Sequence, residues 1–265
     1  MNSAILDRLQ LGLVLLALSG TAWGDLVIRV TQGNDSPTKI AIAPIANAGA
    51  ALTEDIARIV EADLQRSGLF ALTPREDMLS YPTMVKDVYY RDWRLVGSEY
   101  LVVGNMTQME DGRYAIDFSL LSVTAQKPVF KHRVTGSAEQ IRDLSHLISD
   151  KVYREITGIP GIFSTRIAYV TATQVAERMT YRLHVADADG AREELMLESA
   201  EPIMSPAWSP DAKELAYVSF ETGRPAIFQQ NLQTAERRQL TNFFGLNGAP
   251  AWSPDGTQLA LVLSK

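Results

Sequence analysis

The stretch Ser205 to Val218 reads SPAWSPDAKELAYV, and Ala249 to Val262 reads APAWSPDGTQLALV. Both contain Pro-Ala-Trp-Ser-Pro-Asp followed by a short apolar run, and their tryptophans, Trp208 and Trp252, are 44 residues apart. A repeat of this length that holds several short strands is typical of a β-propeller blade. The repeat therefore predicts an all-β propeller in the second part of the chain.

A third, partial copy of the repeat, Arg166 to Val170 (RIAYV), comes earlier in the chain. It aligns Ala168 with Ala216 and Ala260, at spacings of 48 and 44 residues. Because a propeller needs roughly four or more blades to close, we expect residues 164–265 to hold about the first two to three blades of one.

The Ser-Pro-Asp sequence of each full repeat predicts a tight turn. Proline fixes φ at the second turn position, and the aspartate carboxylate accepts a hydrogen bond from the backbone two residues on. We therefore interpret Asp211 and Asp255 as structural residues rather than ligands. The preceding tryptophans, Trp208 and Trp252, are interpreted as apolar wedges between neighbouring sheets.

The region before the repeats has a mixed pattern that predicts an α/β domain over residues 25–157. Residues 39–45 (KIAIAPI) indicate a buried strand, and residues 53–67 carry apolar side chains at helical spacing, with Thr53 as the cap and Gly68 at the end. A weaker helical region, 74–98, contains Trp93.

Three further strands and a closing helix follow in this domain. The strands are predicted at 100–103, 114–121 and 128–134, with a hairpin turn at Asp111-Gly112. The closing helix is predicted at about 138–156, where Ile141, Leu144, Ile148, Val152 and Ile156 share one face. Two glycines and a proline interrupt the helical pattern after it, so we place a linker at 158–163.

The first residues have the pattern of a secretory signal peptide. An apolar run at residues 9–18 (LQLGLVLLAL) precedes the small-residue sequence Ala22-Trp23-Gly24, so residues 1–24 are predicted to be removed by cleavage before Asp25. A non-cleaved anchor is the alternative, because Asp7 offsets the charge of Arg8 before the apolar run. No cysteine follows the apolar run, which excludes a lipid anchor on cysteine and predicts a soluble exported protein.

Composition and motifs argue against catalysis, metal binding and nucleic-acid binding. The formal net charge is −6, without a basic stripe, and the chain has no cysteine. His132, His146 and His184 lack the spacing of metal ligands, and we expect each to be a surface or strand residue. No nucleophile elbow, Walker loop or dinucleotide fingerprint is present in the sequence. We therefore expect no catalytic residues, no cofactor and no metal.

Three stretches together resemble the TolB family of the Tol-Pal cell-envelope system. They are 156–170 (ITGIPGIFSTRIAYV), 204–218 (MSPAWSPDAKELAYV) and 247–256 (NGAPAWSPDG). The resemblance implies an α/β N-terminal domain, a six-bladed propeller of which this chain holds the first part, and a periplasmic location. It also implies a non-enzymatic scaffold that links TolA to the lipoprotein Pal and supports outer-membrane integrity and constriction at cell division.

The resemblance further implies that the segment after the signal peptide binds the C-terminal domain of TolA. An extended segment with alternating apolar side chains suits strand addition to a partner's sheet edge, although an ordinary first strand of the domain fits the same pattern. The residues concerned are Asp25, Leu26, Val27, Ile28, Arg29, Val30, Thr31, Gln32, Gly33, Asn34, Asp35 and Ser36.

The same resemblance implies that Pal binds the propeller through the loops before the tryptophan motifs. Leu246 and Asn247 are the strongest candidates, because a glycine-flanked loop that exposes leucine can serve as an anchor; capping of a blade by Leu246 is the alternative. The positions carried over are Glu201, Met204, Phe244, Leu246, Asn247 and Ala249.

Two other function classes remain open on the sequence. The chain could be the propeller portion of a serine peptidase of the prolyl oligopeptidase kind, since such propellers share the Ser-Pro-Asp-Gly turn. It could also be a periplasmic propeller that binds a small ligand in its channel. A separate α/β domain between signal peptide and propeller favours the TolB family over the peptidase. A convergent set of aromatic and charged residues at the channel mouth would favour the small-ligand binder, and no such cluster can be read from the sequence.

Overall fold

The computed structural model describes residues 36–47 and 54–264. The predicted signal peptide and cleavage site lie outside the described residues. Within them, no helix is both long enough and apolar enough to cross a membrane.

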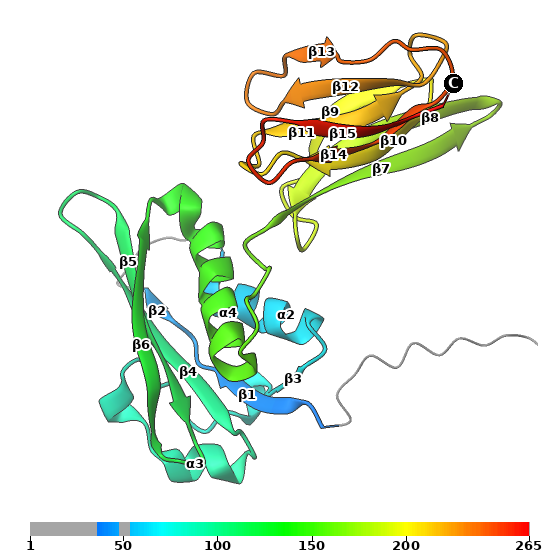
Figure 1. The fold of residues 1–265 in the computed structure, drawn as a ribbon. Coiled ribbons are helices and arrows are strands. Elements are labelled where there is room, and N and C mark those ends of the chain that lie inside the picture. Colours follow the sequence, from blue (N-terminus) through cyan, green and yellow to red (C-terminus); the bar gives the residue numbers. More distant parts are fainter. Residues whose placement is uncertain (1–35, 48–53, 265) are drawn as a thin grey trace, which may run out of the picture. The chain divides into compact units, whose positions relative to one another are not determined.

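A mixed sheet forms the first part of the fold (Figure 1). Its strand order is β3-β1-β4-β5-β6, with β2 beside β4; β1 pairs in parallel with β3 and β4, and β5 pairs antiparallel with β4 and β6. The hairpin between β4 and β5 turns at Asp111 and Gly112, as predicted, with Gly112 at φ +83°. The bounds are β1 Thr38–Ile42, β2 Ala46–Asn47, β3 Phe70–Leu72, β4 Tyr100–Gln108, β5 Tyr114–Ser122 and β6 Lys127–Gly136.

Two helices, α2 (Ile56–Arg66) and α4 (Ile141–Thr157), cover one face of this sheet (Figure 1). Both end as the sequence predicts, because Gly68 and Gly158 take the left-handed conformation at φ +72° and +75°. The start of α2 differs from the prediction. Asp55 is its cap and accepts a hydrogen bond from the Arg58 amide at 3.2 Å, whereas Thr53 lies outside the described residues.

The main core lies between these helices and the sheet. The predicted apolar face of α4 is buried, except that Ile156 is only partly buried against the core. The fully buried members with the largest side chains include Ile40, Leu64, Phe118, Leu120 and Ile148.

The segment 74–98 is much less helical than predicted. It holds two short 3-10 turns, Arg75–Asp77 and Val85–Asp87, and one short helix, α3 (Tyr90–Leu95). Trp93 nevertheless is buried, in a second cluster on the sheet that also contains Leu101 and Leu121. The segment is therefore ordered by packing of single large side chains rather than by an amphipathic helix.

Three antiparallel sheets make up the second part of the chain, in line with the repeat. The first has the order β7-β8-β9, the second β10-β11-β12-β13 and the third β14-β15. The bounds are β7 Arg166–Val175, β8 Arg178–Asp187, β9 Glu194–Ser199, β10 Ile203–Trp208, β11 Glu214–Ser219, β12 Ala226–Asn231, β13 Arg237–Gln239, β14 Asn247–Trp252 and β15 Leu259–Leu263.

The Ser-Pro-Asp turns have the predicted geometry. Asp211 accepts from the Lys213 amide at 3.2 Å, and Asp255 accepts from the Thr257 amide at 3.1 Å. A serine hydroxyl hydrogen-bonds each aspartate, and this contact holds the pKa of Asp211 and of Asp255 below its usual range. Both carboxylates are thus used within their own turns.

The tryptophans join neighbouring sheets, as predicted. Trp252 Nε1 donates to the carbonyl of Ala207 at 3.2 Å, which links the third sheet to the second. Trp208 packs against an apolar cluster that contains Leu183 of the first sheet and Tyr217 of the second. These contacts make the sheets consecutive blades of a partial propeller.

Candidate functional site

A group of exposed apolar side chains lies before and at the start of the inner strands β10 and β14. The exposed fractions are 46% for Met204, 58% for Phe243, 87% for Phe244 and 59% for Leu246. Because β10 and β14 are equivalent strands of adjacent repeats, the residues that precede them lie at the same end of the propeller. We call Glu201, Met204, Phe243, Phe244 and Leu246 the propeller loop surface.

The loop that carries three of these side chains is held by contacts on several sides. Asn247 donates from Nδ2 to the carbonyls of Phe243 and Gly245 at 2.9 and 3.2 Å. Ser264 donates from its backbone N–H to the Leu246 carbonyl at 3.1 Å and accepts from the Leu246 amide at 2.8 Å. Gly245 is required there, since φ is +83° and a Cβ would lie 2.5 Å from the Ser264 carbonyl oxygen.

Phe244 is in addition held from the neighbouring blade. The guanidinium of Arg224, in the turn between β11 and β12, lies 4.9 Å from the centroid of the Phe244 ring. Arg224 also donates from Nε to Asn242 Oδ1 at 3.0 Å. This cation–π contact favours the exposed position of the ring.

Both inner strands carry the same backbone irregularity beside this surface. Ser205 and Ala249 have φ of +51° and +47°, and the strand registers shift at these positions. A β-bulge of this kind redirects the side chains next to it, and a non-glycine residue at positive φ is strained. The Ser-Pro and Ala-Pro pairs of the repeats mark these positions in the sequence, although the sequence analysis did not identify a bulge.

The structure exposes five of the six predicted propeller residues, which are Glu201, Met204, Phe244, Leu246 and Ala249. Asn247 is the exception, because its side chain is 0% exposed. Its side chain holds the loop backbone and is not exposed to a partner, since it donates to the carbonyls of Phe243 and Gly245. Phe243 and Arg224 were not predicted; an aromatic pair followed by glycine was the available signal for Phe243.

The predicted N-terminal segment is almost entirely beyond the described part of the chain. Residues 25–35 lie outside it, and Ser36 is exposed just before β1. Its binding role therefore stays a prediction.

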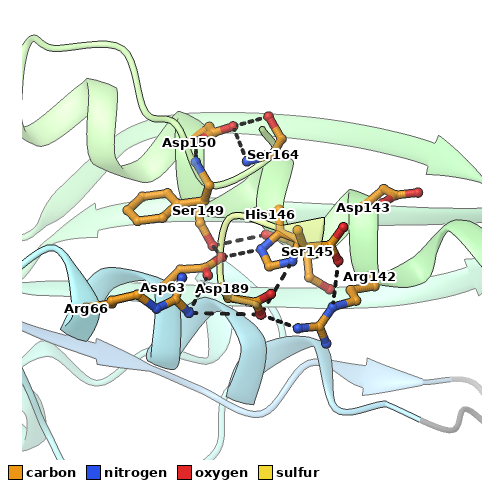
Figure 2. A network of polar contacts seen from close by, with 12 residues as sticks. Asp63, Arg66, Arg142, Asp143, Ser145, His146, Ser149, Asp150, Ser164 and Asp189 are labelled. Atoms are coloured by element: carbon orange, nitrogen blue, oxygen red, sulfur yellow. Dashed lines mark hydrogen bonds and ion pairs between the residues drawn. The ribbon is translucent and has the colours of Figure 1, made fainter. Parts of the chain in front are cut away.

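A second concentration of functional groups is a polar network around His146 (Figure 2). His146, on α4, is only 2% exposed, in contrast to the expected surface or strand position. Its Nδ1 lies 2.7 Å from Asp63 Oδ2 on α2, and Nε2 lies 3.9 Å from Asp189 Oδ2 in the turn between β8 and β9. The Ser149 hydroxyl donates to Asp63 at 2.7 Å and not to the imidazole, so this is no nucleophile–base pair.

Arginines already compensate the carboxylates of this network. Arg66 pairs with Asp63 at 3.3 Å and lies 4.0 Å from Asp189, and Arg142 pairs with Asp189 as well. Burial alone would raise the pKa of Asp189. The Ala191 amide and the charges of Arg142, His146 and Arg66 outweigh burial and lower it.

Two family descriptions match the two parts of this chain. The TolB amino-terminal domain matches residues 26–129, and the TolB beta propeller domain matches residues 153–265. The chain belongs to the TolB family. The TolB amino-terminal match covers strands β1 to β5 and helices α2 and α3, and the TolB propeller match covers the three antiparallel sheets.

Similar proteins carry the name Tol-Pal system protein TolB. One from Marinomonas sp. (strain MWYL1) is 53% identical over 236 residues, which are 88% of this chain and 55% of that protein. One from Hahella chejuensis is 47% identical over 238 residues, 89% of this chain and 55% of that protein. The chain thus spans about half the length of these TolB relatives.

A solved TolB structure has the same fold. The crystal structure of TolB from Acinetobacter baumannii superposes with a TM-score of 0.77 at 40% identity, covering 89% of this chain and 57% of that one. The family members are named as components of the Tol-Pal system, which is an assembly of the cell envelope.

Proposed function

We propose that this protein is a non-enzymatic periplasmic scaffold that links TolA to the lipoprotein Pal and so supports outer-membrane integrity and constriction at division. In this proposal Pal binds the propeller loop surface, and TolA binds the segment 25–36. The observation that carries it is the 87% exposure of Phe244 on a loop held by neighbouring residues.

A rigid, exposed aromatic side chain is suited to protein binding rather than to catalysis. Aromatic anchors contribute most of the energy in many interfaces, and a loop ordered before binding loses little entropy on association. Phe244 and Leu246 are exposed while Asn247 and Ser264 fix the loop backbone beneath them. Leaving so much apolar surface in water is unfavourable unless a partner covers it.

Chemistry at the other sites is consistent with a scaffold. Asp211 and Asp255 are used within their turns, and the His146 network consists of ion pairs that connect elements of the fold. Both turn aspartates and the carboxylates around His146 thus make structural contacts.

Strand addition is the proposed mode for the N-terminal segment. Residues 25–30 (DLVIRV) alternate in a way that lets one face contact a partner while backbone groups pair with its sheet edge. The acidic and basic side chains in this segment then remain on the solvent face.

Co-purification in which both partners are measured tests the proposal. The protein is added to detergent-solubilised envelopes, and TolA and Pal are quantified in the recovered material. Leu246→Ser should lose Pal and keep TolA, whereas deletion of residues 25–36 should lose TolA and keep Pal. Recovery of neither partner by the folded, unsubstituted protein would refute the proposal.

Leu95→Ser is the matched control for Leu246→Ser. Leu95 is 71% exposed on α3, so the same loss of exposed apolar surface occurs away from the propeller loop surface. It should recover both partners. Equal loss of Pal by both variants would assign the effect to the loss of any exposed leucine side chain and not to the loop.

A further inference from the structure

Both ring nitrogens of His146 face carboxylates from different elements. Nδ1 lies 2.7 Å from Asp63 Oδ2 on α2, and Nε2 lies 3.9 Å from Asp189 Oδ2 in the β8–β9 turn (Figure 2). Nε2 is buried and has no hydrogen-bond partner within the described part of the chain. The imidazole therefore sits between the helices of the amino-terminal domain and the first propeller sheet.

The neutral imidazole satisfies only one of these two contacts. It carries a single N–H, which the short distance assigns to Nδ1 and Asp63. Nε2 then points a lone pair toward the Asp189 carboxylate, which explains why it has no partner. When Nε2 also carries a proton, its N–H faces the Asp189 carboxylate. The charged ring then contacts both Asp63 and Asp189.

Charged groups of both signs lie around the ring. They come from every element packed against it and comprise five carboxylates and four guanidiniums. They are Asp63 and Arg66 on α2, Arg142 and Asp143 on α4, Arg166 on β7, Asp187, Asp189 and Arg192 in and beside the β8–β9 turn, and Glu194 on β9. A protonated ring would make the cations equal in number to these carboxylates.

Solvent protons have a route to the ring. His146 is one of the residues that line a cavity of about 320 Å³, together with Ser164, Thr165, Asp187 and Arg192. The cavity lies against the β8–β9 turn, so a change of charge on the ring acts directly on the contacts of that turn.

We propose that His146 is a proton-operated clasp, which when protonated fastens the β8–β9 turn of the propeller to helices α2 and α4. Because the ion pairs need the charged ring, the clasp is fastened at lower pH and loosens as pH rises and the proton leaves. The turn keeps its Arg142 contacts to Asp187 and Asp189 in both states, so loosening is local. This device does not depend on the proposed binding of TolA and Pal.

Amide hydrogen exchange in the β8–β9 turn tests the clasp. Protection of the amides of Ala188 and Gly190, corrected for intrinsic exchange, should fall on the order of tenfold between about pH 5.5 and about pH 8. His146→Asn keeps a donor for Asp63 but cannot be charged, so its protection should be low and independent of pH. His132→Asn, at an exposed histidine on β6, is the control and should keep the original profile.

A profile that is flat in the unsubstituted protein, or unchanged in His146→Asn, would overturn the proposal. Nitrogen chemical shifts of the ring in the unsubstituted protein provide a second measurement that needs no variant. Both ring nitrogens should carry protons at about pH 5.5 and only Nδ1 at about pH 8; a ring that keeps one protonation state across this range would equally overturn the clasp.

Discussion

Exchanging alanine and glycine between the two Ser-Pro-Asp turns should change stability in opposite directions. Ala212 and Gly256 occupy the same turn position in adjacent repeats, and both have positive φ, +56° and +72°. A residue with a Cβ is strained by about 1–2 kcal/mol at positive φ. Glycine avoids this strain but loses about 0.5–1 kcal/mol more backbone entropy on folding than alanine does. Ala212→Gly should therefore raise the free energy of unfolding by about 0.5–1 kcal/mol.

Gly256→Ala should lower stability by about the same 0.5–1 kcal/mol. A Cβ at Gly256 would lie 3.6 Å from Pro210 Cδ, an ordinary contact, so only the backbone conformation matters. Thermal unfolding followed by circular dichroism measures both, with an expected shift of about 2–4 °C per kcal/mol for a domain of this size.

A strand alanine provides the control for these two changes. Ala251→Gly, in β14, should destabilise, because glycine there adds entropy cost without relieving positive φ. If Ala212→Gly lowered stability as Ala251→Gly does, the turn would not be strained at that position and the argument from φ would be refuted.

Four further outcomes follow from the structure. Gln230→Leu should cost about 2 kcal/mol, since it removes the acceptor of the Tyr217 hydroxyl proton and the side-chain donor to the Met196 carbonyl, while Gln229→Leu should cost under about 1 kcal/mol; urea unfolding that ranks them equally would contradict this. Trp208→Ala should cost about 3 kcal/mol by the same assay, and a loss below about 1 kcal/mol would show that it is no wedge. The Ser253 hydroxyl holds the pKa of Asp255 below its usual range, so the Asp255 carboxylate stabilises its turn above the unfolded-state pKa of about 4 and loses this effect as pH falls through the lower folded pKa. Hydrogen exchange of the Thr257 amide should therefore depend on pH in this range, and Asp255→Asn should remove the dependence. A pH dependence that persists in Asp255→Asn would contradict the argument. Deleting residues 25–36 should leave the melting temperature unchanged, because the core of the described residues begins within β1, and a clear drop in melting temperature would contradict that.

Periodic features of the fold could be predicted from sequence because a single local rule dominates each of them. The spacing of Trp208 and Trp252 predicted the propeller sheets. Gly68 and Gly158 predicted where two helices end, since only glycine reaches the left-handed conformation without strain. The segment 74–98 could not be predicted in this way. There, Trp93 is held by the sheet against which it packs, and tertiary contact overrides helical spacing.

The exposure of the candidate site residues was predictable only where it follows from their position in a loop. Phe244 and Leu246 lie in a turn region and are exposed. Asn247 is next to them in sequence but is buried, because the loop carbonyls need a donor that no pattern reveals. The His146 network depends on residues 83 and 43 positions away, Asp63 and Asp189, and such long-range contacts leave no local signal.

Site-specific photo-crosslinking tests the central claim that the propeller loop surface binds Pal. A photoreactive phenylalanine analogue at Phe244 keeps the exposed aromatic ring in place, and the same analogue at Tyr89, which is 73% exposed before α3, is the comparison. Irradiation of cells should join position 244, and not position 89, to Pal. Efficient crosslinking of position 244 to other proteins with no Pal product would contradict the account.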